Sequence, residues 1–341
     1  MSENNTSSGF AKGCLATSLI VMSIMLGISF LLNLGLITAF VAKEGIASSI
    51  SSDKAEDEFP QFTEKWSYGS GDVKVVRIPI SGIISRDKTD GLFSEQMDMT
   101  ETTLRQIKAA QNDEDIAGIL LEVDSPGGTV TSSDEIYMAL KKFKESREDR
   151  TIVTFVRDMA ASGGFYVAMA SDKIIAEPTS IIGSIGVIMQ TINLTGLSRK
   201  IGVEDVTIKS GDNKDILNPF RPVNTQHIEI LQALIDDSYK KFFNIVKEGR
   251  RLDETKLKAI ADGSVFHSDA ALTNGLIDQI GYLDDALALI KDLLGAPEVK
   301  IIKYNTREYF FDWLTEAKNP MPDIKSIYRP DAPRLMYIWR P

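Results

Sequence analysis

Short apolar runs alternate with helical patterns along most of this chain, and that alternation constrains the fold more than any other feature. The runs IAGILLEV at 116–123 and TIVTFV at 151–156 are typical of buried strands, and helical patterns at 97–111 and 132–146 accompany them. Strands that are covered by helices on both faces pair in parallel. We therefore expect an α/β fold with a largely parallel sheet.

The same reasoning predicts the remaining elements of the body. A strand is expected at 72–84, a long amphipathic helix at 224–248 and a small helical region at 253–295. The buried stripe of the long helix is expected to comprise Ile228, Leu231, Ile235, Phe242 and Val246. Three further short strands are predicted at 173–178, 184–189 and 205–209.

The segment from Gly13 to Ala42 contains no charged residue over 30 positions. About 20 apolar residues are enough to cross a bilayer, whereas the apolar core of a cleaved signal peptide, the alternative, is usually shorter. We predict a transmembrane anchor at 14–42 that follows a cytoplasmic N-terminus at 1–13. Lys12 and the acidic residues after Lys43 favour a body on the external side of the membrane.

The rest of the chain divides by composition. Residues 43–65 form a polar stalk, residues 66–299 a folded body, and residues 300–341 a C-terminal extension that holds five of the twelve prolines. The extension ends in APRLMYIWRP, which is too apolar to lie bare in water. It is expected to pack against the body or a sister subunit, or else to insert into a site of the protein itself.

Composition excludes several classes of function. The net charge of −10 argues against a nucleic-acid partner, which requires clustered basic residues. The single cysteine, Cys14, rules out a disulfide within the chain and a cysteine-rich zinc site. No cofactor is expected.

Two loops at predicted strand ends carry the candidate chemistry. DSPGGTV follows the strand at 116–123, and Gly127 and Gly128 could turn backbone amides outward there. Ser162 and Gly163 follow the strand at 151–156, where a helix N-terminus favours developing negative charge. Donors from two strand ends could form an oxyanion hole. An ordinary turn and a plain helix N-cap are the alternatives.

A serine nucleophile also needs a base. His227 and His267 are the only histidines, and each also fits a structural position in or beside a helix. No HExxH or GxSxG motif is present. Lysine is the remaining type of candidate base.

The motifs SPGG, MAASGGFYVAMASDKIIAEPTSIIGSIGVI and TIKSGDNKD, in that order, resemble the signal peptide peptidase A family over about residues 72–295. The resemblance implies the Clp-protease/crotonase-like ββα superhelix and a Ser–Lys dyad. It implies Ser162 as nucleophile, Lys214 as general base, Ser184 as the group that orients the lysine, and Gly128 and Gly163 as oxyanion donors. Lys209 is the second candidate base. Because Asp212 and Asp215 flank Lys214, we expect both carboxylates to face away from the site.

The resemblance also implies a function. It is that of a membrane-anchored serine endopeptidase that degrades remnant signal peptides and other hydrophobic peptides, in a homo-oligomeric ring whose subunits share active sites. A crotonase-like acyl-CoA enzyme and an inactive membrane scaffold on the same fold are the alternatives.

Overall fold

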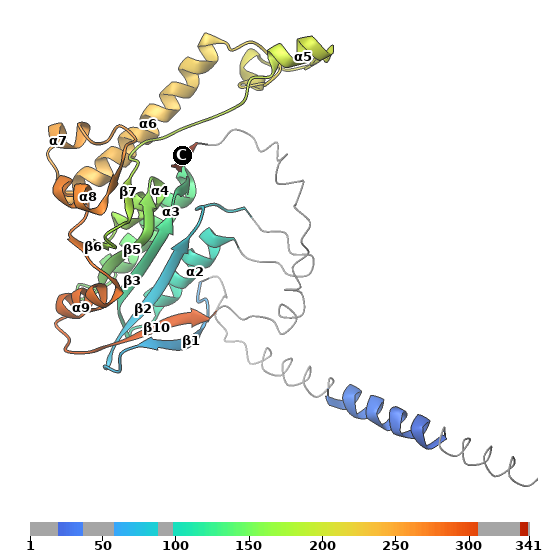
Figure 1. Ribbon diagram of the computed structural model, residues 1–341, viewed down its shortest axis with the longest axis vertical. Coiled ribbons are helices and arrows are strands. Elements are labelled where there is room, and N and C mark those ends of the chain that lie inside the picture. The colour runs from blue at the N-terminus through green and yellow to red at the C-terminus, as the bar shows by residue number, and fades with distance from the viewer. Residues whose placement is uncertain (1–19, 37–57, 88–97, 306–334, 340–341) are drawn as a thin grey trace, which may run out of the picture. The chain divides into compact units, whose positions relative to one another are not determined.

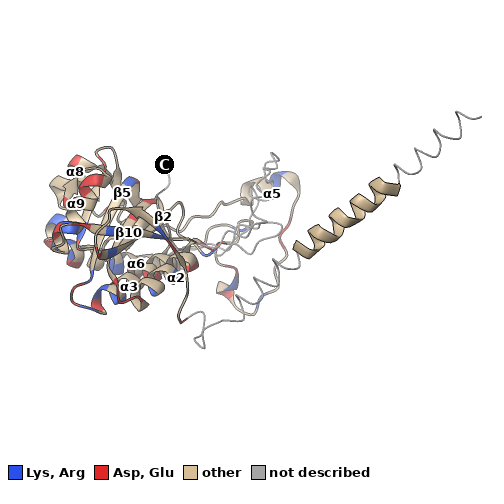
Figure 2. Cartoon of the chain, turned by 90° about the horizontal axis from the view of Figure 1, so that it is seen from below, with Lys and Arg blue, Asp and Glu red and all other residues tan. Residues whose placement is uncertain are grey.

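The computed structural model describes residues 20–36, 58–87, 98–305 and 335–339. The chain divides into two compact units, Met1–Glu58 and Phe59–Pro341. In the first unit residues 20–36 form a helix that bears no charged side chain (Figure 2). No helix within the described ranges is long and apolar enough to cross a membrane. Both ends of the predicted anchor at 14–42 lie outside these ranges, as do the N-terminus at 1–13 and residues 43–57 of the stalk.

The second unit is built on a mixed sheet (Figure 1). Its described strands are ordered β1–β10–β2–β3–β5–β6–β9, with β7 beside β5 and β8 beside β7. The central pairs are parallel, and the pairs β1–β10 and β7–β8 are antiparallel. The bounds are β1 Thr63–Tyr68, β2 Val73–Ser81, β3 Ile116–Ser125, β5 Thr151–Ala161, β6 Lys173–Ala176, β7 Ile181–Gly183, β8 Val265–His267, β9 Gln279–Ile280 and β10 Val299–Asn305.

Alternate residues of a strand face opposite sides of the sheet, so a strand that is apolar throughout needs helices on both sides to cover it. Val76 of β2 and Ile119 of β3 join a core with α2, α3, α4 and α6, whereas Val75 and Leu120 join a second core with α9. The main helices are α2 Met99–Asn112, α3 Val130–Glu145, α4 Gly163–Ala168, α6 Thr225–Arg250 and α9 Leu283–Leu293, and the shorter ones are α5 Thr195–Ile201, η1 Asp212–Asp215, α7 Glu254–Lys258 and α8 Ser268–Asn274. The expectation of an α/β fold is confirmed.

Two of the predicted strands are wrong. The sheet uses β7, Ile181–Gly183, in place of 184–189, because Ser184 adopts a φ of 52° and turns the chain away from the ladder. Residues 205–209 form no strand, since Val206 and Ile208 project into solvent and no strand of the described ranges lies beside them. The edge strand β1, the inner strand β10 and the short strands β8 and β9 were not predicted from the sequence.

Residues 190–238, called the arm below, differ from the rest of the second unit. In Figure 1, α6 runs away from the sheet and α5 lies near its far end. Ser198 is the one buried residue of the arm. The predicted stripe of α6 is therefore wrong in its N-terminal half: Phe242 and Val246 are buried, but Ile228 is exposed and Leu231 and Ile235 are only partly covered. The apolar periodicity is present, yet no residue in the described ranges covers this half.

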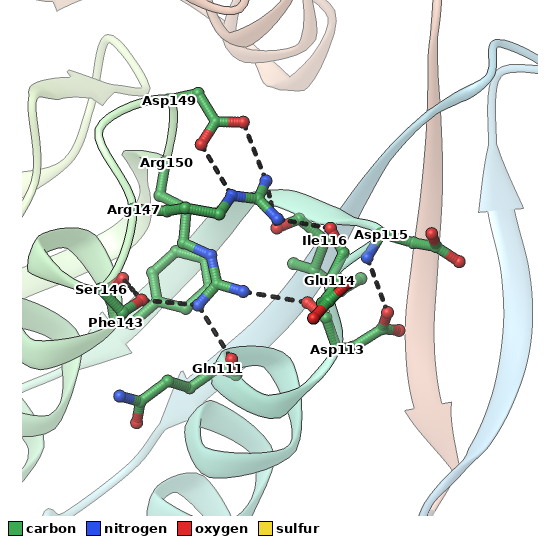
Figure 3. A network of polar contacts seen from close by, with 10 residues as sticks. All are labelled: Gln111, Asp113, Glu114, Asp115, Ile116, Phe143, Ser146, Arg147, Asp149 and Arg150. Carbon is green, nitrogen blue, oxygen red and sulfur yellow. Dashed lines mark hydrogen bonds and ion pairs between the residues drawn. The ribbon is translucent and has the colours of Figure 1, made fainter.

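A network of arginines fastens the amino ends of β3 and β5 (Figure 3). Arg150 donates to the carbonyl oxygens of Gln111 at 3.1 Å and Asp113 at 2.9 Å, and its guanidinium lies 4.5 Å from the centre of the Phe143 ring. Arg147 pairs with Asp149 and donates to the backbone at the start of β3. This network ties α2 and α3 to the sheet at the edge opposite the carboxyl ends of the strands.

Candidate active site

The two candidate serines and the two candidate oxyanion glycines come together at the carboxyl ends of β3, β5 and β7. These strands are parallel neighbours, with Ser125 opposite Ala160 and Ala161 opposite Gly183. Parallel strands end at the same edge of a sheet, where ligands bind in open α/β folds. The turns that follow therefore lie beside one another, as the sequence predicts.

Ser162 occupies a strained turn between β5 and α4. Its φ of 52° and ψ of −114° lie outside the regions that L-residues prefer, and only 1% of the residue is exposed. Its amide donates to the Gly183 carbonyl at 2.7 Å, which fixes the turn. The hydroxyl makes no capping hydrogen bond, although Ser162 stands at the N-cap position of α4. The N-cap alternative therefore gives no reason for a serine here, and such strain is often found at functional sites.

Gly128 and Gly163 are glycines because no side chain fits at either place. A Cβ on Gly128, in the short strand β4 Gly127–Thr129, would lie 1.9 Å from the Ile84 carbonyl oxygen. A Cβ on Gly163 would lie 2.5 Å from the Ser133 hydroxyl and 3.0 Å from the Gly128 amide nitrogen. The amide of one candidate donor is thus next to the Cα of the other.

Ser184 directly follows β7, just as Ser162 directly follows the neighbouring strand β5. Its φ is also 52°, it is buried, and its amide donates to the Ser264 carbonyl at 2.7 Å. Because Gly183 pairs with Ala161, Ser184 and Ser162 occupy equivalent places at the ends of adjacent strands.

Lys214 is not brought to these serines within one chain. It lies in η1 on the arm, is exposed, and forms no hydrogen bond or ion pair through its side chain with any residue in the described ranges. Lys209 is engaged elsewhere, since its Nζ lies 2.7 Å from the Asp215 carboxylate and 2.9 Å from the Asp212 carbonyl oxygen. The hydrogen bond from Lys209, together with the charges of Lys209 and Arg221, lowers the pKa of Asp215.

Neither histidine approaches Ser162 through a hydrogen bond among the described residues. His227 lies in the first turn of α6 on the arm, and His267 is the N-cap residue of α8, where it pairs with Ile181 across β8 and β7. The described ranges also hold no group of three or more His, Cys, Asp or Glu side chains that could bind a metal ion. Lysine therefore remains the candidate base.

The end of the chain lies against the candidate oxyanion loop. Strand β11, Met336–Ile338, pairs antiparallel with β4, and Trp339 donates to the Pro126 carbonyl at 2.8 Å. On its other edge Met336 exchanges two backbone hydrogen bonds with Ile188, each 3.0 Å long. The prediction that the tail packs against the body is thus met for residues 335–339, while residues 306–334 lie outside the described ranges.

An open cavity of about 610 Å³ adjoins the tail on its C-terminal side. Burial and the nearby charge of Asp158 raise the pKa of Asp124 in its wall. The residues that line the cavity are Gly82, Ile83, Asp124, Pro126, Asp158, Met159, Ile338 and Trp339.

Comparison with known proteins identifies the family. Residues 144–296 match the model of peptidase family S49. An Enterococcus faecium protein named "Putative signal peptide peptidase SppA" is 37% identical over 248 residues, which cover 72% of each chain. The chain belongs to peptidase family S49. The protein is accordingly a serine peptidase, which sets aside the acyl-CoA enzyme, and its resemblance to the signal peptide peptidase A family is confirmed.

Two further similarities are more distant. "Serine protease SPPA, chloroplastic" of Arabidopsis thaliana is 29% identical over 77% of this chain and 38% of its own. The structure of a ClpP1 point mutant from Listeria monocytogenes matches 62% of this chain and 93% of its own, with 15% identity and a TM-score of 0.40. The Clp-protease/crotonase-like ββα superhelix stays a prediction at that level of similarity.

Three residues that contact the candidate oxyanion glycines were not predicted from the sequence. Ile84 and Ser133 crowd the two glycines, and Tyr337 pairs with Gly128. Ile84 and Ser133 stand in ordinary apolar and helical patterns, so the sequence offered no signal for them. The continuous apolar run LMYIW was such a signal for Tyr337, because a short apolar segment can pair as a strand with an exposed strand edge.

Proposed function

We propose that this peptidase is a membrane-anchored endopeptidase with a Ser–Lys dyad, in which Ser162 of one subunit works with Lys214 of a neighbouring subunit. One observation carries the proposal. The strained, buried Ser162 lies beside Gly128 and Gly163 with no base hydrogen-bonded to it among the described residues, whereas Lys214 stands on an arm with little cover.

The reaction proceeds through an acyl-enzyme. The Ser162 hydroxyl attacks the peptide carbonyl while the neutral Lys214 amine takes its proton, and the C–N bond breaks as that proton passes to the leaving amine. The amides of Gly128 and Gly163 bind the developing oxyanion, for which one donor is typically worth about 3–4 kcal/mol. Water activated by Lys214 then hydrolyses the ester. Ser184 holds the lysine by a hydrogen bond.

The arm supports assembly with a second copy of the chain. Its exposed apolar side chains are Ile192, Leu197, Ile201, Val203, Val206, Ile208, Phe220, Val223, Ile228, Ile230 and Leu234. An exposed apolar surface of this extent is typical of a protein interface. A head-to-tail contact through the arm generates a homo-oligomeric ring, buries these side chains and carries Lys214 into apolar surroundings, where the uncharged amine is favoured.

The uncharged segment from Gly13 to Ala42 supports attachment to a bacterial membrane, with the peptidase body on the outer side. The proposed substrates are remnant signal peptides and other hydrophobic peptides, as the name of the Enterococcus faecium relative suggests for that protein.

Mixing two inactive variants tests the shared site. Ser162→Ala and Lys214→Ala should each lose hydrolysis of a hydrophobic peptide, and Lys65→Ala, at an exposed lysine of β1, should retain it. Refolding the two inactive proteins together should restore about one quarter of wild-type activity, because each head-to-tail contact then pairs an intact serine with an intact lysine in one case of four. Activity in either variant alone would overturn the dyad, and a mixture that stays inactive would overturn the shared site.

A further inference from the structure

The candidate oxyanion amide belongs to a peptide group with a glycine on each side. Gly127 adopts a φ of 103°, which residues with a Cβ rarely adopt, and Gly128 has no room for a side chain. The two glycines let the backbone approach a substrate closely, but they also leave the peptide group between them free to rotate. An oxyanion hole requires a donor whose direction is fixed before the reaction. Other residues must therefore hold this peptide group.

The chain that continues beyond β2 holds the peptide group from one side. The Ile84 amide donates to the Gly127 carbonyl oxygen at 2.9 Å, and the Thr129 amide donates to the Ile84 carbonyl oxygen at 2.8 Å. The carbonyl and the amide of a trans peptide point in opposite directions. Because β3 lies between β2 and β5, the Gly128 amide points away from Ile84 and toward the turn after β5, where Gly163 lies.

Ser125 at the end of β3 joins the loop to the same continuation of β2. Its hydroxyl is buried with the rest of the residue, donates to the Gly82 carbonyl oxygen at 2.6 Å and accepts from the Gly127 amide at 3.1 Å. These two bonds require one side-chain group that both donates and accepts, which a hydroxyl does. Ser125 thus fixes the peptide group on the amino side of Gly127, while Ile84 fixes the one on its carboxyl side.

The continuation of β2 is itself fastened to two helices of the body. The hydroxyl of Thr100, a fully buried residue of α2, donates to the Ser85 carbonyl oxygen at 2.9 Å. Arg86 donates to the Glu101 carboxylate of α2 at 2.9 Å and to the Glu135 carboxylate of α3 at 2.8 Å. The segment 82–86 is therefore held between β3 and the helices, and it cannot shift without breaking these bonds.

We infer that the segment 82–86 and Ser125 set the direction of the Gly128 amide, and that Ser125 is a positioning residue for the candidate oxyanion hole. Ser125 acts through the backbone of the loop. A preset amide meets the developing negative charge without reorganisation, whereas a peptide group that is free to rotate must first be ordered. Its loss should therefore weaken binding of the transition state more than binding of the substrate. The inference rests on the proposed function and adds a positioning residue to it.

Ser125→Ala tests this role with two probes. Hydrolysis of acetyl-Leu-Leu-Leu-aminomethylcoumarin gives kcat and KM, and the aldehyde acetyl-Leu-Leu-leucinal gives an inhibition constant. The Ser162 oxygen adds to the aldehyde carbon, the hydroxyl proton passes to the base, and no group leaves, so the adduct keeps its oxyanion in the hole. Ser125→Ala should lower kcat by about 10- to 100-fold, change KM by less than about 2-fold and weaken aldehyde inhibition by the same factor as kcat.

Thr154→Val is the matched control for the loss of a buried hydroxyl. Thr154 lies in the amino-terminal half of β5, is fully buried, and its hydroxyl oxygen lies 2.6 Å from the Ser171 hydroxyl oxygen. The variant loses one buried hydrogen bond, as Ser125→Ala does, so thermal melting should fall by a comparable amount in both proteins. In Thr154→Val, kcat and aldehyde inhibition should nevertheless stay unchanged.

The pair Thr100→Val and Thr100→Ser decides the question if Ser125→Ala does not fold. Valine has nearly the shape of threonine but cannot donate to the Ser85 carbonyl oxygen, whereas serine keeps the hydroxyl. Thr100→Val should lower kcat by about 3- to 10-fold, in parallel with aldehyde inhibition, since one buried hydrogen bond that holds the segment is lost. Thr100→Ser should restore most of that loss.

The outcomes separate this inference from the proposed function. Equal kcat in folded Ser125→Ala and Thr154→Val proteins, or in Thr100→Val and Thr100→Ser, would overturn the positioning role and leave the dyad standing. A fall in kcat without a matching loss of aldehyde inhibition would also overturn it, because the oxyanion would not be involved. Hydrolysis that survives Ser162→Ala would overturn the proposed function itself.

Discussion

The body and the arm of this peptidase both carry regularly spaced apolar residues, but these residues are buried in the body and exposed on the arm. In the body, the strand residues and the inner faces of α2 and α3 are buried within the same chain, and Ser162 at the end of β5 is 1% exposed. On the arm, the side chain of Ile208 is 98% exposed and Val206 is 85% exposed. The body buries its apolar residues within one chain, whereas the apolar residues of the arm are left largely exposed by the described part of the chain.

Helix α6 shows both cases in one element. Phe242 and Val246 in its C-terminal half are fully buried against the body, while Ile228 and Leu234 in its N-terminal half are 43% and 46% exposed. One amphipathic repeat runs through both halves. The repeat indicates that a face will be covered, but it does not identify the surface that covers it.

The largest expected effect comes from placing charge on the arm. The double variant Val206→Asp/Ile208→Asp should abolish assembly and reduce peptide hydrolysis by at least about 100-fold, because two unpaired carboxylates cannot be buried in an apolar interface without a cost of several kcal/mol. Sedimentation velocity measures the assembly, and thermal melting of the body should be unchanged.

The control for the arm variant is Leu272→Asp, at an exposed leucine of α8 in the body, which should keep both the assembly and the activity. If the arm variant remains assembled and active, the arm is not the interface and the comparison between the two regions fails.

The next largest effect is a difference in stability between truncations in the two halves of α6. Phe242→Ala should reduce the free energy of unfolding by about 3–5 kcal/mol, because it leaves a cavity among packed aromatic rings. Leu234→Ala should change it by less than about 0.5 kcal/mol in the unassembled Val206→Asp/Ile208→Asp background. Urea denaturation of the two proteins at equal concentration measures both values. Equal destabilisation would show that the N-terminal half already packs within one chain.

The parts of the fold that could be predicted from sequence are those fixed by local pattern. β3 and β5 begin at the predicted residues, and the turns after them lie side by side because parallel strands end at a common edge. That rule places Ser162, Gly163 and Gly128 together without any knowledge of side-chain contacts. The small residues in both turns reflect how closely the backbones approach each other.

The parts that could not be predicted depend on partners distant in sequence. β10 joins the sheet between β1 and β2, and β11 pairs with β4, although neither pairing follows from a local repeat. Residues 205–209 have the composition of a strand, yet the described part of the chain offers them no edge to join. The position of Lys214 could not be predicted for a similar reason, since no contact among the described residues relates this exposed side chain to Ser162.

The smallest expected effect concerns the conformation of the arm around Lys214. Lys209 and Arg221 lower the pKa of Asp215, so this carboxylate stabilises the folded arm above its unfolded pKa, and the contribution is lost as pH falls through the lower folded value. Asp215→Asn should therefore accelerate hydrogen exchange of the η1 amides at pH 7, where the ion pair is intact, and reduce activity only a few-fold, because the group is near the surface.

Asp212→Asn is the matched control, since Lys209 contacts only the backbone carbonyl of Asp212 and that group is retained. If Asp215→Asn instead lost activity as completely as Lys214→Ala, the Asp215 carboxylate would take a direct part in the reaction. The assignment of a chemical role to Lys214 and a structural role to Lys209, which pairs with Asp215, would then fail.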